Sequence, residues 1–72
     1  MFKSNIRMIM EEKKITMREM TALTGLSSRT LTKARSDAEI SECRLSTLAR
    51  IAAALGVKTK RLFEEVAEND TA

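Results

Sequence analysis

Three signals between residues 16 and 27 constrain the fold of this chain more than any other feature. Thr16 and Glu19 have the spacing of a capping box, in which the hydroxyl accepts from a free helix amide and the carboxylate accepts from the Thr16 amide. Gly25 can take the left-handed conformation that ends many helices, and Ser27 is a good N-cap two residues later. The sequence therefore predicts a helix from Thr16 to Gly25, a Gly-Leu-Ser turn and a following helix over residues 28 to about 35.

Apolar residues at helical spacing predict a preceding helix and the inner faces of this pair. Ile6, Ile9 and Met10 indicate an amphipathic helix within residues 4–14. The paired helices are expected to bury Met20, Leu23, Leu31 and Ala34. Residues 36–44 show no clear periodicity, so we expect them to form a connecting loop.

The clearest helical pattern lies in the second half of the chain. One apolar stripe contains Leu45, Leu48, Ile51, Ala52 and Leu55, and Gly56 follows as a helix-ending residue. Val57, Leu62, Phe63 and Val66 outline a short fifth helix from about residue 60. These patterns predict an all-α, five-helix domain over residues 1–67, with the helix pair at about 16–35 and a short acidic tail over 68–72.

Length and composition exclude several classes of protein. A domain of 72 residues buries only about 60% of the surface that its unfolded chain exposes. Such a small core leaves little room for a catalytic cleft. With no His and one Cys, the chain can form neither a disulfide framework nor a four-ligand zinc site, so we expect no metal, no cofactor and a reducing compartment. The longest apolar run, 51–55, is far below the about 20 residues of a membrane span, and no leader pattern is present. We therefore expect a cytoplasmic protein that does not enter a membrane.

The charge is distributed unevenly along the chain. The net charge is +3, and all 13 Lys and Arg residues lie at or before Arg61, whereas four of the ten acids follow it. A basic body with a short acidic end is typical of a nucleic-acid binder, although it is equally compatible with an ordinary solvated surface.

Other residue groups have a simpler interpretation than a functional one. Methionines at helical spacing more often fill a small core than form a binding surface, which we expect for Met10 and Met20 rather than a role for the set that also includes Met8 and Met17. Cys43 is expected to act as a small apolar residue, with redox sensing as the alternative. The adjacent pairs Glu11-Glu12 and Glu64-Glu65 do not face each other on a helix, so the sequence shows no carboxylate dyad and no enzyme is predicted.

The run from Met17 to Arg35 resembles the helix-turn-helix of Cro/XRE-type transcriptional regulators, which have a lambda-repressor-like fold. The matching positions are Leu23, the Gly25-Leu26-Ser27 turn and Leu31, and the resemblance extends over 6–12, 15–16 and 45–63. The chain departs from the family pattern at four places. It has Met17 for a Gln that meets a phosphate, Thr21 for Ala, Arg35 for Glu, and Glu42-Cys43-Arg44 for Asn-Pro-Ser in a loop about two residues longer.

The resemblance implies that the second helix of the pair enters the major groove of double-stranded DNA. It implies base contacts from Ser27, Ser28, Arg29, Thr32 and Lys33. Phosphate contacts would come from Lys14, Thr16, Arg18 and Ser36, of which Lys14 and Arg18 are equally interpretable as solvated surface charges. The family usually pairs through the chain end and the loop before the fourth helix, which implies a homodimer on a near-palindromic site with Ile40, Phe63 and Val66 at the interface. Phe63 has the alternative role of closing the monomer core.

The resulting hypothesis is a small Cro-like repressor that binds double-stranded DNA and has no small-molecule substrate. The alternative is a protein-interaction module, such as the antitoxin of a toxin–antitoxin pair. An exposed apolar patch on the fourth and fifth helices would favour that alternative.

Overall fold

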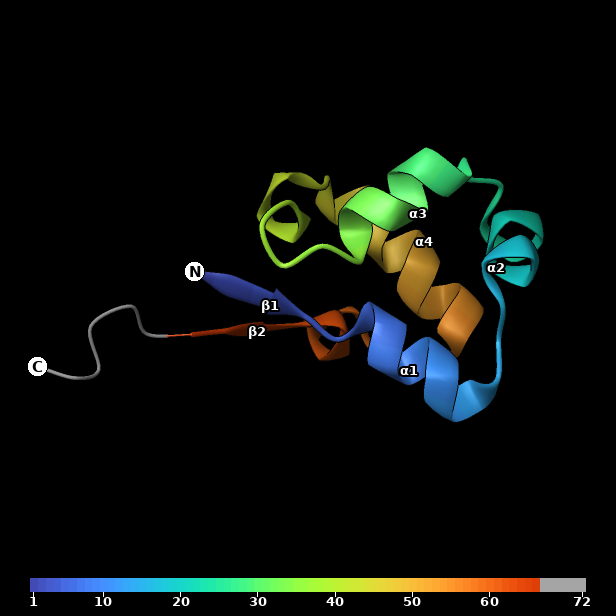
Figure 1. Cartoon of the computed structure of the whole chain (residues 1–72), viewed down its shortest axis with the longest axis horizontal. Coiled ribbons are helices and arrows are strands. Elements are labelled where there is room, and N and C mark those ends of the chain that lie inside the picture. The colour runs from blue at the N-terminus through green and yellow to red at the C-terminus, as the bar shows by residue number, and fades with distance from the viewer. Residues whose placement is uncertain (67–72) are drawn as a thin grey trace, which may run out of the picture.

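The computed structural model describes residues 1–66. They form a group of short helices, one of which is central, and a separate two-stranded sheet (Figure 1). The α-helices are α1 (Ile6–Lys13), α2 (Met17–Thr24), α3 (Ser28–Ala34) and α4 (Leu45–Leu55). Single turns of 3-10 helix form η1 (Ile40–Glu42) and η2 (Thr59–Leu62), and the strands are β1 (Phe2–Ser4) and β2 (Phe63–Glu65). No helix among these residues is long and apolar enough to cross a membrane. The predicted acidic tail over 68–72 lies outside the described residues.

The predicted signals at the ends of α2 and α3 are confirmed. The Glu19 amide donates to Thr16 Oγ1 at 3.1 Å, and the Thr16 amide donates to Glu19 Oε1 at 3.0 Å, which completes the capping box. Gly25 ends α2 with a φ of 73°, a left-handed conformation that glycine adopts without a Cβ clash. The Ser27 hydroxyl caps α3 by accepting from the Thr30 amide at 3.2 Å. Each of these helices has at most eight residues, so its stability depends on such caps and on packing.

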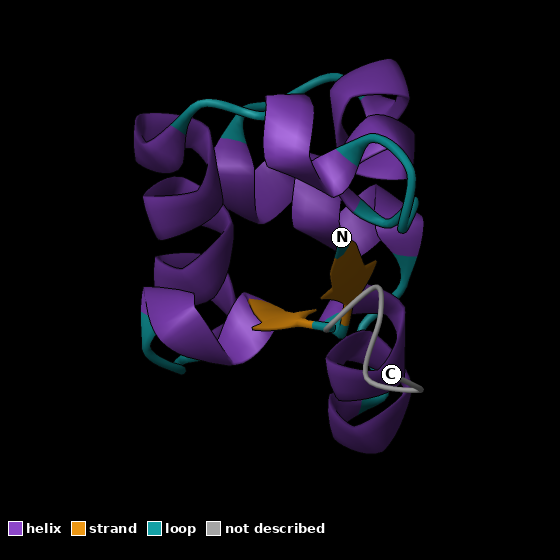
Figure 2. Cartoon of the chain, turned by 90° about the vertical axis from the view of Figure 1, so that its left-hand side faces the viewer, coloured by secondary structure: helices purple, strands orange, loops and turns teal. Residues whose placement is uncertain are grey.

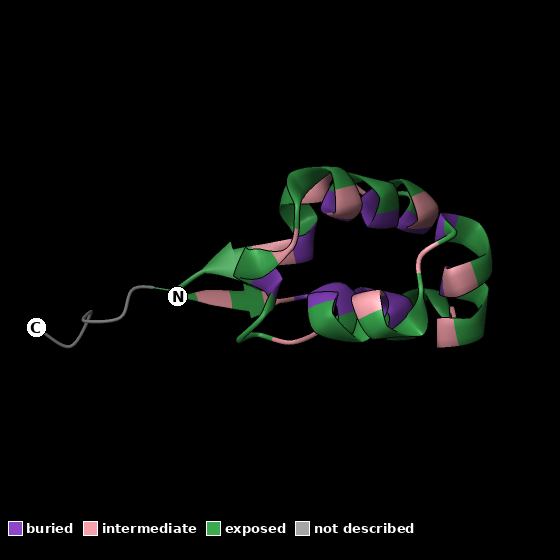
Figure 3. Cartoon of the chain, turned by 90° about the horizontal axis from the view of Figure 1, so that it is seen from above, coloured by how far each residue is buried: buried purple, intermediate pink, exposed green. Residues whose placement is uncertain are grey.

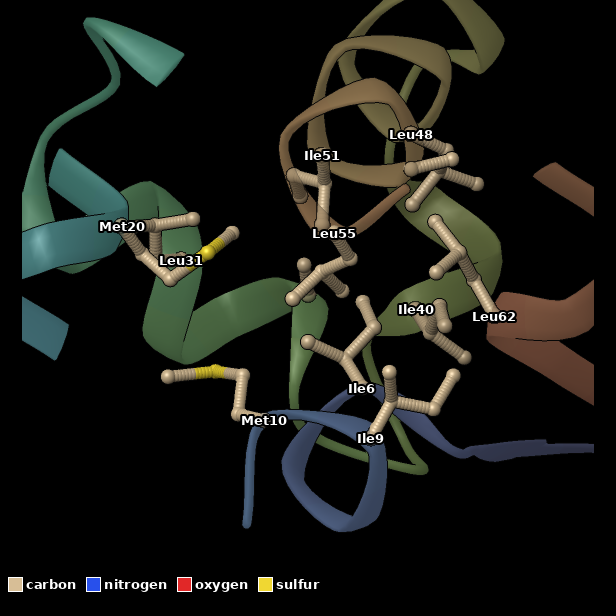
Figure 4. Packing of buried hydrophobic residues seen from close by; sticks show 12 residues of the cluster. Ile6, Ile9, Met10, Met20, Leu31, Ile40, Leu48, Ile51, Leu55 and Leu62 are labelled. Atoms are coloured by element: carbon tan, nitrogen blue, oxygen red, sulfur yellow. The ribbon is translucent and has the colours of Figure 1, made fainter. Parts of the chain in front are cut away.

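The core is built around α4, which packs against α1, α2 and η2. Its buried residues Leu48, Ile51, Ala52 and Leu55 confirm most of the predicted stripe. Met10 and Met20 are 4% and 0% exposed and also belong to the core, as predicted (Figure 4). Figure 3 shows the buried positions on the inward faces of the helices and the exposed ones on their outer faces.

The predicted burial of Leu23 on the inner face of α2 is wrong. Its side chain is 60% exposed, whereas Thr24, one position further, is 6% exposed. Thr24 follows the buried Met20 by four residues, so both lie on the same face of the helix. Its hydroxyl donates to the Met20 carbonyl at 2.6 Å, which removes most of the cost of burying a polar group.

Two further predictions are corrected on either side of the start of α4. The first stripe residue, Leu45, is 70% exposed because the helix begins there, at the rim of a surface groove rather than in the core. The predicted loop over 36–44 contains the turn η1, and its Ile40 is only 2% exposed. Ile40 is therefore a core residue, and its side chain offers little surface to a partner.

The predicted fifth helix is reduced to the single turn η2, and a small two-stranded sheet is added to the mostly helical fold. The chain forms η2 and then β2, which pairs antiparallel with β1 in the register Phe2 to Glu65, Lys3 to Glu64 and Ser4 to Phe63 (Figure 2). This pairing also removes Ser4 from the first helix, which begins at Ile6. The rings of Phe2 and Phe63 meet edge to face, with centroids 5.9 Å apart.

Asn5 connects the sheet to the helices. It is 8% exposed, its amide donates to the Leu62 carbonyl at 2.8 Å, and its side chain donates to the Arg61 carbonyl and Glu64 Oε1, both at 3.3 Å. These bonds join residues more than fifty positions apart. A local pattern of apolar residues carries no information about such a pairing. The helical spacing of apolar residues near the chain end therefore predicted a helix where the chain forms a strand.

Truncation of the α4 stripe is expected to destabilise the fold strongly. Leu48→Ala should lower the free energy of unfolding by about 2 to 5 kcal/mol, because Leu48 is 6% exposed and its loss leaves a cavity. Leu45→Ala, on the same helix, is the matched control and should change it by less than about 0.5 kcal/mol. Urea denaturation measures both values. Equal effects of the two substitutions would contradict the observed orientation of α4, in which Leu48 faces the core and Leu45 faces solvent.

Candidate nucleic-acid interface

The two faces of α3 differ sharply in burial. Leu31 and Ala34 are fully buried and fix the helix against the core. The residues Ser28, Arg29, Thr32 and Lys33 are exposed on the helix, and the exposed Ser27 precedes them as its cap. Three hydroxyl residues and two cations are therefore exposed on a rigidly anchored helix and its cap. All five are the residues predicted from the sequence to contact bases.

Two adjacent surface depressions bring most of the predicted site residues together. The first is lined by Ser28, Arg29, Thr32, Lys33, Ser36 and Glu39. The second lies between the first turns of α2 and α3 and is lined by Met17, Arg18, Thr21, Leu26, Ser27 and Ser28. Ser28 lines both, so the two form one continuous surface, to which Arg18 and Ser36 also belong. Lys14 and Thr16 lie before α2 and line neither depression.

Lys14 has an unusual backbone conformation for a lysine. It ends α1 with a φ of 56°, the only non-glycine residue among 1–66 with a positive φ. A left-handed conformation costs a residue with a side chain about 1–2 kcal/mol, and glycine would avoid this cost. The chain thus keeps a cation two residues before the Thr16 cap at a position where glycine is favoured.

Acidic residues adjoin the C-terminal half of α3, and this proximity was not predicted from the sequence. Glu39 lines the first depression, and Lys33 Nζ lies 4.0 Å from Glu42 Oε1. Both partners of this ion pair are largely exposed, so it contributes little to stability. It does reduce the positive charge beside Lys33. No local signal in the sequence identified these acids, because their approach to α3 depends on the path of residues 36–42.

An apolar groove with a volume of about 170 Å³ lies on another part of the surface. It is lined by Phe2, Ile40, Ser41, Cys43, Leu45, Leu48 and Phe63. This volume is below the about 300–1,000 Å³ of typical small-molecule sites. Phe63 is half-buried and packs against the core. Val66 directly follows β2 and is 37% exposed. Of the predicted interface residues, Phe63 and Ile40 therefore line this groove, with Ile40 at its buried side.

The environment of Cys43 differs from that of a reactive cysteine. Partial burial raises the pKa of the Cys43 thiol; Lys33 lowers it, whereas Glu39 and Glu42 raise it further. Reactive and sensing cysteines instead have a lowered pKa that favours the thiolate. The structure thus favours the interpretation of Cys43 as a small apolar residue over redox sensing.

Two short capped helices joined by a three-residue turn, the second with an exposed polar and basic face, define a helix-turn-helix DNA-binding protein. Residues 5–68 match the family model of the Cro/C1-type HTH DNA-binding domain, and the chain belongs to this family. No curated protein and no solved structure matches the chain. The family supports DNA binding and confirms the resemblance found in the sequence.

The thiol environment predicts slow alkylation of Cys43. At pH 7.5 the folded protein should react with iodoacetamide more slowly than the urea-unfolded chain, because the raised pKa leaves a smaller thiolate fraction. The rate should also level off at a higher pH in the folded state. Mass spectrometry of the alkylated protein measures both. An equal or faster rate in the folded protein would contradict this description of the thiol.

Proposed function

We propose that this protein is a sequence-specific regulator of transcription, a small Cro-like repressor that acts by occupying its DNA site. The observation that carries the proposal is the continuous surface formed by α3 and the first turn of α2. Its exposed residues offer hydroxyl groups and cations, and the buried residues Leu31 and Ala34 hold α3 in the core.

The residues of α3 have the chemistry for reading base edges. B-DNA's major groove admits one α-helix, and the N-terminal part of that helix contacts the bases. Arg29 can donate two hydrogen bonds to guanine O6 and N7, and Thr32 can offer a hydroxyl or a methyl group. Ser27, Ser28 and Lys33 supply further donors beside them. We assign the main sequence preference to Arg29 and Thr32.

Phosphate contacts are proposed for residues around the start of α2 and the end of α3. Arg18 and Ser36 belong to the same continuous surface as the base-reading residues. Lys14 and Thr16 stand just before α2, whose N-terminal amides and positive dipole end favour an anion. The left-handed Lys14 supports its inclusion, because a costly conformation is more readily kept where the side chain has a task.

Pairing of two copies is proposed through the apolar groove. A helix of seven residues contacts only a few base pairs, too few to identify one site among about a million competitors. Leu45 and Phe63 line the groove, where a second copy would cover their exposed apolar atoms. Val66 follows β2 and is 37% exposed, but it does not line the groove. Ile40 contributes to the floor of the groove rather than to its exposed surface. The DNA site would then be nearly palindromic.

The same groove supports a second candidate function, an antitoxin-like module that binds a different protein. An exposed apolar patch beside α4 is the observation that favours it. Selection of bound sequences from a random duplex pool, with the purified chain alone, separates the two. A palindromic consensus supports the repressor, whereas no enrichment would leave the interaction module as the better explanation.

Substitutions at Arg29 and Lys14 should weaken DNA binding in different ways. Arg29→Ala should weaken binding to the selected site by about 1–3 kcal/mol and leave binding to random duplex nearly unchanged. Lys14→Gly should weaken both alike and reduce the slope of log K against log salt concentration by about one. Fluorescence anisotropy titrations at several salt concentrations measure these quantities.

The controls separate DNA contacts from folding. Glycine takes the left-handed conformation of residue 14 without strain, so Lys14→Gly should retain the thermal stability of the parent. Lys13→Ala removes the neighbouring exposed cation and should leave the salt dependence nearly unchanged. If Arg29→Ala weakened specific and random duplexes equally, its assignment to base reading would be wrong.

The spacing of the two half-sites gives a geometric prediction. In a two-fold dimer the reading helices lie about 34 Å apart, one turn of DNA. Insertion of five base pairs between half-sites places them on opposite faces of the duplex and should reduce affinity to that of a single half-site. Insertion of ten base pairs is the control for distance without a change of face. Unchanged affinity after the five-base-pair insertion would exclude the dimer.

A further inference from the structure

The depression between the first turns of α2 and α3 has a chemical character that the base-reading role of α3 does not explain. Its volume is about 380 Å³, and it is open to solvent. Met17 and Leu26 form its apolar part, and both are half-buried against the core. The surrounding site otherwise consists of hydroxyl groups, cations and the carboxylate of Glu39, so this is an apolar patch within a polar surface.

Hydrogen bonds within the protein make the depression more apolar than its residue types suggest. The Thr21 hydroxyl donates to the Arg18 carbonyl at 2.7 Å, so its methyl group is the part left for a ligand. Ser27 Oγ accepts from the Thr30 amide at 3.2 Å and lies 3.0 Å from Thr30 Oγ1. The Ser28 hydroxyl, by contrast, makes no hydrogen bond within residues 1–66 and remains available at the rim.

We infer that this depression, formed by Met17, Thr21 and Leu26, binds the C5-methyl group of a pyrimidine in the DNA major groove. The methyl group of thymine is the apolar feature that the major groove presents, and apolar side chains recognise it by contact. The free Ser28 hydroxyl is placed to donate to the O4 atom of the same base. Arg18 at the opposite rim is exposed and makes no ion pair within residues 1–66, so its charge is free for the neighbouring phosphate.

The inference rests on the proposed DNA-binding function and adds a specificity determinant outside the exposed face of α3. Met17 belongs to α2, so the base would be read by both helices of the pair. The methyl group can come from thymine or from 5-methylcytosine. A sugar of the DNA backbone could also contact an apolar patch, but that contact would not depend on the base.

The experiment replaces thymine by deoxyuridine at each position of the selected duplex, which removes one methyl group at a time. Burial of one methyl group changes affinity by about threefold to fivefold. We expect one position in each half-site where deoxyuridine weakens binding by this factor. At that position cytosine should bind more weakly than 5-methylcytosine, by a similar factor.

Variants of Met17 assign the effect to the depression. Met17→Gln replaces the thioether by a polar side chain of similar length and should abolish the difference between thymine and deoxyuridine. Met17→Leu should retain it. Met8→Gln, on the exposed face of α1, is the matched control and should leave the difference unchanged. Thermal unfolding of each variant checks that it folds.

The outcomes distinguish failure of the inference from failure of the proposed function. If the protein binds its selected site but no thymine responds to loss of its methyl group, the methyl site is excluded and DNA binding stands. If a response persists in Met17→Gln, another residue makes the contact and the inference is wrong. If Met17→Gln weakens all duplexes equally, the depression contacts the backbone instead. If no duplex is bound at all, the proposed function fails first and the methyl site fails with it.

Discussion

The orientation of α3 relative to α2 depends on one buried hydroxyl group, that of Thr24. It donates to the Met20 carbonyl at 2.6 Å and accepts from the Leu26 amide at 3.1 Å, so it joins the last turn of α2 to the loop that follows. Gly25 supplies the left-handed step between these bonds, and Ser27 then caps α3. The depression lined by Met17 and Leu26 borders this junction, and the depression along α3 begins at Ser28, directly after it. The relative positions of the side chains on this surface therefore depend on these few hydrogen bonds.

Signals that act over a few residues allowed much of the helical part of the fold to be predicted. Thr16, Gly25 and Ser27 set the helix ends, and the spacing from Leu48 to Leu55 set the buried face of α4. The exposed face of α3 followed from the burial of Leu31 and Ala34. The order of the four α-helices and most of the core were therefore accessible from the sequence alone.

The remaining features depend on partners distant in sequence or on side-chain hydrogen bonds. Phe63 and Val66 fit a helical stripe, but Phe63 lies in a strand that pairs with Ser4 and its neighbours. Leu23 is more apolar than Thr24, yet Thr24 is buried because its hydroxyl finds partners in the backbone. In the site, the contribution of Met17 and the approach of Glu39 required the positions of several elements. No single segment of the sequence indicates these two features.

The pairing of β1 with β2 has a consequence for the order in which the domain assembles. It joins residues about sixty positions apart, and closing a long chain segment costs entropy that the two- and three-turn helices do not pay. The helices have local contacts and form early, whereas the sheet and the Phe2–Phe63 contact form only when the chain ends meet. The amides of β1 and β2 should accordingly exchange with solvent by partial openings that leave the helix pair intact. The helix pair and the sheet that borders the groove would then open and close as separate cooperative units.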